Sequence, residues 1–93
     1  MTGAARPLRV RLAPLLAELF PDAPRLVEIE ASSVAALVEA LDARWPGMGD
    51  CLRDSRPAIR RHINVFVNGR RVGLETALEP GADVYILTAI SGG

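Results

Sequence analysis

The sequence contains no lysine, one cysteine and one histidine in 93 residues. All eleven basic side chains are arginines, and eleven acidic residues balance them to a formal net charge of zero. This balance argues against a nucleic-acid binder, which normally carries an excess of positive charge. The single Cys51 excludes an intramolecular disulfide and fits a reducing compartment. Without lysine, the chain offers no side-chain amine for a conjugation reaction.

Long apolar runs and catalytic constellations are also missing. No segment approaches the roughly 18 apolar residues of a membrane span, and Met1–Arg11 lacks the apolar core of a signal peptide, so we expect a cytoplasmic protein. Gly47 and Gly49 have neither the spacing nor the lysine of a phosphate-binding loop. His62 has no accompanying nucleophile, base or metal ligand. We therefore predict no catalytic residue, no metal site and no cofactor bound by the chain itself.

Alternation of apolar and polar residues predicts strands, and turn signals set the limits between them. Asn68-Gly69 favours a tight hairpin turn, and Pro80-Gly81 favours a type II turn before the last strand. The predicted strands are Leu8–Leu12, Leu26–Glu30, Ile63–Val67, Arg70–Gly73 and Asp83–Thr88.

One main helix is predicted after the candidate N-caps Ser32 and Ser33, because apolar residues then recur at spacings of three and four. A shorter helical stretch is expected over Met48–Asp54, and Pro14–Phe20 is predicted to be a loop with at most one helical turn. The chain is thus predicted to be a single α+β domain, residues 1–93, in which a mixed sheet of four to five strands packs on one main helix plus a short second helix. The apolar stripe of the main helix consists of Val34, Leu37, Val38, Leu41 and Trp45.

This element order, the segment Ile63–Gly69, the turn Leu78–Val84 and the Gly92-Gly93 end together resemble the ThiS/MoaD family of sulfur carriers, which have a ubiquitin-like β-grasp fold. The resemblance covers nearly the whole chain. The length and the segment Arg61–Gly69 look more like the carrier that serves cysteine synthesis than like the shorter thiamine carrier. The chain lacks the prolines that relatives often carry before the tail, which leaves the acceptor enzyme open.

The resemblance implies a chemistry at the end of the chain. In that family an E1-like enzyme uses ATP to transfer AMP onto the terminal carboxylate, and a sulfur donor then displaces AMP to leave a thiocarboxylate. The resemblance places this chemistry on Gly93 and leaves ATP to the activating enzyme. Residues 89–93 would form a flexible tail that reaches about 16 Å at roughly 3.3 Å per residue. Ser91 and Gly92 would thread a partner's channel, which small residues do not crowd.

Alternation also predicts where a partner would dock. Phe66, Tyr85 and Leu87 should point away from the main helix, with Arg11 on the same face. Apolar side chains gathered on an exposed face indicate a docking surface, and an arginine there would steer an acidic partner. The alternative is that the segment 13–25 covers part of this face and that the arginine is simply solvated.

Three functions follow from these observations. The first is a sulfur carrier that donates sulfur in the biosynthesis of cysteine or a sulfur-containing cofactor, including the small subunit of molybdopterin synthase. The second is a ubiquitin-like modifier conjugated to other proteins through Gly93, and the third is a β-grasp interaction module with an incidental tail. For the first, the expected partners are an E1-like activating enzyme and a sulfur-accepting synthase, with no nucleic acid and no membrane. We expect a monomer when the chain is free, acting as a carrier and not as an enzyme.

Overall fold

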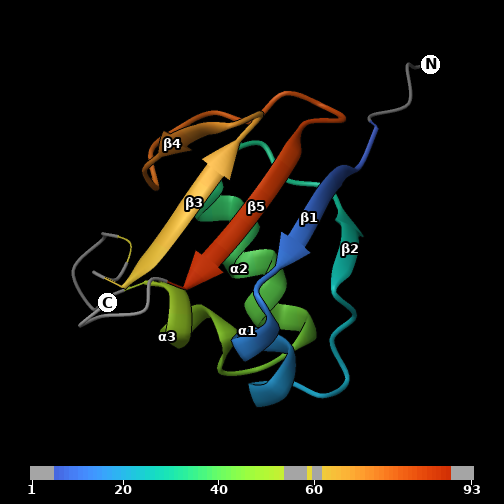
Figure 1. Cartoon of the computed structure of the whole chain (residues 1–93). Coiled ribbons are helices and arrows are strands. Elements are labelled where there is room, and N and C mark those ends of the chain that lie inside the picture. Colours follow the sequence, from blue (N-terminus) through green and yellow to red (C-terminus); the bar gives the residue numbers. More distant parts are fainter. Residues whose placement is uncertain (1–5, 54–58, 60–61, 89–93) are drawn as a thin grey trace.

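The computed structural model describes residues 6–53, 59 and 62–88. One five-stranded sheet has α2 packed behind it, and α1 and α3 lie toward the end of the sheet where β1 and β5 terminate (Figure 1). The elements in chain order are β1 (Leu8–Leu12), α1 (Pro14–Leu19), β2 (Leu26–Ile29), α2 (Val34–Arg44), α3 (Met48–Leu52), β3 (Ile63–Val67), β4 (Arg70–Val72) and β5 (Asp83–Thr88).

The strand order across the sheet is β2-β1-β5-β3-β4. The first and last strands are parallel neighbours at the centre, where Val10 lies opposite Val84, and the other pairs are antiparallel. The hairpin between β3 and β4 turns at Asn68 and Gly69, whose φ angles of 50° and 87° are the positive values that such a turn requires. The expected mixed α+β sheet is confirmed with five strands.

The core lies between the sheet and α2. β1 alternates strictly between buried and exposed residues, and the inner side chains Val10, Val65, Val84 and Ile86 are at most 2% exposed. Each buried aliphatic side chain stabilises the fold by about 1.5–3 kcal/mol. Val67 alternates with Phe66 and so belongs to the inner face, but it is half-buried because it adjoins the hairpin turn.

α2 begins where Ser33, not Ser32, caps it: the Ser33 Oγ accepts a hydrogen bond from the Ala36 N–H at 3.1 Å. The expected stripe faces the core, with Val34, Leu37, Val38 and Leu41 buried. Trp45 ends the helix and is half-buried against the core. None of the helices among the described residues is long and apolar enough to cross a membrane.

The prediction that Pro14–Phe20 is a loop with at most one helical turn is wrong, because α1 is a six-residue helix. Pro14 starts the helix, where its missing N–H costs no hydrogen bond, and Leu16 is buried at 1% exposure. Pro21 follows the helix and only prevents its extension. Burial of Leu16 thus decides a local structure that the flanking prolines left ambiguous.

Three other boundaries differ from the prediction by one or two residues. β2 ends at Ile29, β4 at Val72 and α3 at Leu52. In α3, Leu52 is also the last buried side chain. Cys51 of this helix is half-buried against the core.

Candidate functional site

The sheet face turned away from α2 carries a row of side chains on three adjacent strands. Tyr85 of β5 lies opposite Arg11 of β1 on one side and opposite Phe66 of β3 on the other. Paired residues project from the same face of a sheet, so the register brings these three side chains together. Tyr85 is 44% exposed, Arg11 is exposed, and Phe66 and Leu87 are half-buried.

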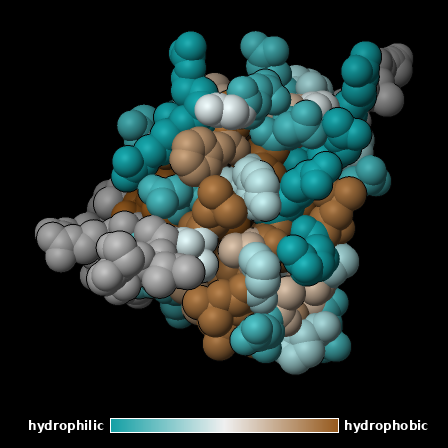
Figure 2. All heavy atoms as spheres, viewed as in Figure 1, coloured by the Kyte–Doolittle hydropathy of each residue, from teal (hydrophilic) through white to brown (hydrophobic). Residues whose placement is uncertain are grey.

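These four predicted docking residues line one surface hollow of about 300 Å³, together with Gly69, Asp83 and Val84. We call the surface formed by Arg11, Phe66, Tyr85 and Leu87 the open face. Figure 2 shows hydrophobic residues near the middle of this side of the molecule with hydrophilic residues around much of its margin. Such a partly apolar patch with a polar rim is typical of a protein-binding surface.

The segment 13–25 does not cover this row. It forms α1 beyond the end of β1 and then returns to β2 at the edge of the sheet (Figure 1). Arg11 and Tyr85 therefore remain exposed, as a docking surface requires.

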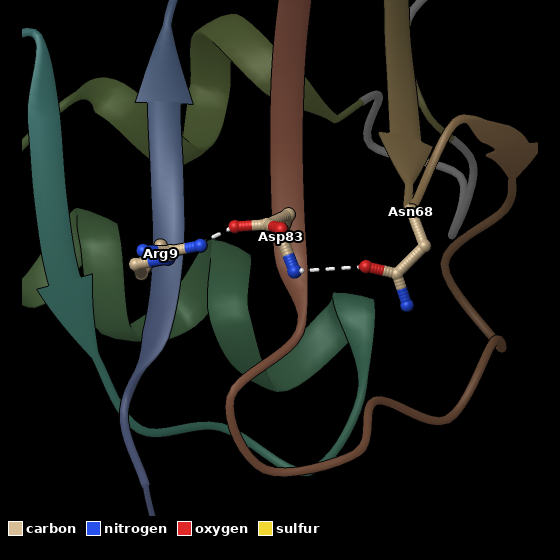
Figure 3. A network of polar contacts seen from close by, with 3 residues as sticks. All are labelled: Arg9, Asn68 and Asp83. Atoms are coloured by element: carbon tan, nitrogen blue, oxygen red, sulfur yellow. Dashed lines mark hydrogen bonds and ion pairs between the residues drawn. The ribbon is translucent and has the colours of Figure 1, made fainter.

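The structure distinguishes two arginines that alternation alone treats alike. Arg9 Nε lies 3.0 Å from Asp83 Oδ1, although both side chains are more than half exposed and such a pair contributes only about 0–1 kcal/mol (Figure 3). Arg11 makes no ion pair with any of the described residues. The uncompensated positive charge on β1 thus lies beside Tyr85, at the hollow.

Asn68 has a role that its place in a turn did not predict. Its Oδ1 accepts a hydrogen bond from the Asp83 N–H at 3.1 Å (Figure 3). Its own N–H donates to the Asp83 carbonyl oxygen at 2.8 Å. These bonds tie the β3–β4 hairpin to the start of β5 and hold Asp83 beside Arg9. The Asn-Gly pair predicted the turn, but only the adjacency of β3 and β5 reveals the bonds.

The predicted attachment residue Gly93 and the threading residues Gly92 and Ser91 lie outside the described residues, and the last described residue is Thr88 at the end of β5. His62 is exposed. Within the described part of the chain, no group of three or more His, Cys, Asp or Glu side chains could hold a metal ion. The geometry supports a binding surface next to the start of the C-terminal segment.

A mixed five-stranded sheet with parallel central strands, packed on one main helix, defines a protein of the ubiquitin-like β-grasp class. A sequence model of the ThiS family matches residues 13–93. The chain therefore belongs to the ThiS family, a group of ubiquitin-like sulfur carriers and modifiers.

Solved structures agree with this membership. A chain of the BexX/CysO complex from Amycolatopsis orientalis is 27% identical with a TM-score of 0.83, covering 92% of this chain and 99% of that one. CysO from Mycobacterium tuberculosis is 27% identical with a TM-score of 0.79, covering 89% and 99%. SAMP1 from Haloferax volcanii is 25% identical with a TM-score of 0.77, covering 92% and 98%. No curated protein sequence matches the chain significantly.

Proposed function

We propose that this protein is a sulfur carrier whose Gly93 carboxylate is adenylated by an E1-like enzyme and then converted to a thiocarboxylate. The observation that carries the proposal is the ThiS family match over residues 13–93, because it extends to the terminal glycine. A carboxylate resists nucleophiles until one of its oxygens belongs to a good leaving group. ATP supplies that group with release of pyrophosphate, and the attacking sulfur then expels AMP.

The position of the open face supports delivery of Gly93 to such an enzyme. Residues 89–93 follow directly after β5, and Leu87, a residue of the open face, is next to its end. Five extended residues span about 16 Å. An enzyme that holds the open face with apolar side chains, and places a carboxylate near Arg11, would have Gly93 within reach of its nucleotide.

The test is to incubate the protein with the E1-like enzyme from the same genome, ATP and a sulfur source. Replacement of oxygen by sulfur should raise the mass by about 16 Da, because only one atom of the carboxylate is exchanged. A chain without Gly92 and Gly93 is the control and should gain nothing. The proposal would be contradicted if the mass of the full chain stays unchanged while the same enzyme preparation adenylates another carrier protein.

For the receiving pathway, we propose cysteine synthesis, supported by the likeness to two CysO structures at 27% identity. The loaded protein should then release its sulfur to a cysteine synthase homologue from the same genome. Transfer only to a molybdopterin synthase large subunit would instead assign the chain to cofactor synthesis.

The similarity to SAMP1, a small archaeal modifier protein, favours protein conjugation as a second candidate. Because the chain has no lysine, it cannot form lysine-linked chains with itself. A tagged chain recovered from cells covalently joined through Gly93 to larger proteins would support this role, whereas recovery only as the free species would favour sulfur delivery.

A further inference from the structure

A second apolar hollow, of about 280 Å³, lies where β5 ends. Leu15, Leu16 and Leu19 of α1 line it, and Ile63 and Thr88 of the sheet complete it together with Cys51 and His62. Leu16 is buried, but Leu15 and Leu19 are 48% and 56% exposed. They stand four residues apart on one side of the helix, so together they form one surface, which we call the α1 surface.

The two hollows lie on either side of the chain as it leaves β5. Leu87 lines the hollow of the open face, and the next residue, Thr88, lines the hollow of α1. Successive residues of a strand point to opposite sides, so this division follows from the pleat. The end of β5 therefore lies between two apolar surfaces.

We infer that the enzyme acting on Gly93 contacts both surfaces, and that an apolar side chain at the mouth of its channel packs between Leu15 and Leu19. This inference rests on the proposed function. The length of chain beyond Thr88 supports it: five residues reach about 16 Å, so the mouth of any channel that encloses Gly93 lies close to the end of β5. The residues of the enzyme that form this mouth therefore contact the open face on one side of β5 and the α1 surface on the other.

The chemistry of the hollow selects an apolar occupant. Among the described residues, aliphatic side chains make up most of its lining, and the only ionisable groups there are Cys51 and His62. A charged partner group buried against the leucines would lose its hydration, whereas an aliphatic or aromatic group would remove the exposed leucines from water.

The test compares the double variant Leu15→Gln/Leu19→Gln with Ala43→Gln in the loading reaction. Glutamine keeps the size and helix propensity of leucine and leaves the net charge unchanged. Ala43 is a control because it is an exposed helical position on α2, which lies behind the sheet and away from both surfaces (Figure 1). For the double variant, the concentration of carrier that gives half the maximal loading rate should rise about tenfold, and the maximal rate should stay unchanged because Gly93 is intact. Ala43→Gln should change either value less than about twofold.

Other outcomes overturn the inference. Wild-type kinetics in the double variant, or an equal loss in Ala43→Gln, would remove the α1 surface from the interface. The proposed function would still stand if the wild type is loaded. A dimer in sedimentation velocity that dissociates in the double variant would assign the surface to a second copy. A lower melting temperature after deletion of residues 89–93 would assign it to the chain's own end. Failure of the wild type to load would overturn both proposals.

Discussion

At the scale of single residues, Asn68 links the β3–β4 hairpin, the start of β5 and the ion pair of Asp83. It adopts a φ of 50°, which few residues other than glycine tolerate, and its side chain and N–H both bond to Asp83. Asp83 in turn pairs with Arg9. One turn residue therefore fixes the hairpin, the start of β5 and the charge next to the open face.

Replacement of Asn68 separates these contributions. Asn68→Ala should lower the free energy of unfolding by about 1–2 kcal/mol, because it loses a hydrogen bond and strains the left-handed backbone. Asn68→Gly keeps the backbone freedom and should lose only about 0.5–1 kcal/mol. Urea denaturation of the two variants measures the difference. Equal losses would show that backbone strain contributes nothing at this position.

At the scale of elements, α1 is too short to be stable by itself, since isolated helices of fewer than about 12 residues are marginal in water. Its stability comes from Leu16, which is 1% exposed, while Leu15 beside it is 48% exposed. The same turn of helix therefore anchors itself in the core and presents leucines outward. The sequence predicts a loop here because Pro21 and Pro24 indicate a break soon after the segment begins.

The two neighbouring leucines should differ strongly in their effect on stability. Leu16→Ala should lower the free energy of unfolding by about 2–5 kcal/mol, because it leaves a cavity in the core. Leu15→Ala should change it by less than about 1 kcal/mol, because half of that side chain is already in water. Thermal and urea unfolding measure both values. Similar losses in the two variants would contradict the division of α1 into an anchoring side and an exposed side.

At the scale of the whole molecule, the sheet joins segments from opposite ends of the chain. Arg11 of β1 lies beside Tyr85 of β5 only because these strands are parallel neighbours. The same pairing neutralises Arg9 through Asp83. The open face thus has one compensated and one uncompensated arginine, although both belong to the same strand.

This difference predicts unequal effects of two substitutions with the same change in net charge. Arg11→Gln should lower the loading rate by about three- to tenfold at low salt, and the loss should shrink as salt screens the attraction to an acidic partner. Arg9→Gln should lower it less, because Arg9 already pairs with Asp83. Loading rates from low to high ionic strength provide the measurement. Equal losses would mean that only the overall charge matters.

Much of the fold and part of the candidate site could be predicted from the sequence. Alternation predicted that Phe66, Tyr85 and Leu87 share a face, and the structure brings them together with Arg11 at one hollow. The exposed leucines of α1 were missed, because their importance depends on the end of β5 lying nearby. The sequence could not predict that Arg9 forms an ion pair with Asp83 whereas Arg11 forms none with the described residues, since both arginines occupy outward positions of the same strand.

The amino-acid sequence by itself determined the strands, the main helix, the tight turns and which strand side chains share a face, because these depend on residues close together along the chain. Tertiary structure alone decided that β1 and β5 are neighbours, that α1 is helical, and that Asp83 pairs with Arg9. These features depend on packing between segments far apart in the sequence. Burial of Leu16 and the central pairing of β1 with β5 contribute to the free energy of folding, and local sequence patterns contain no information about either.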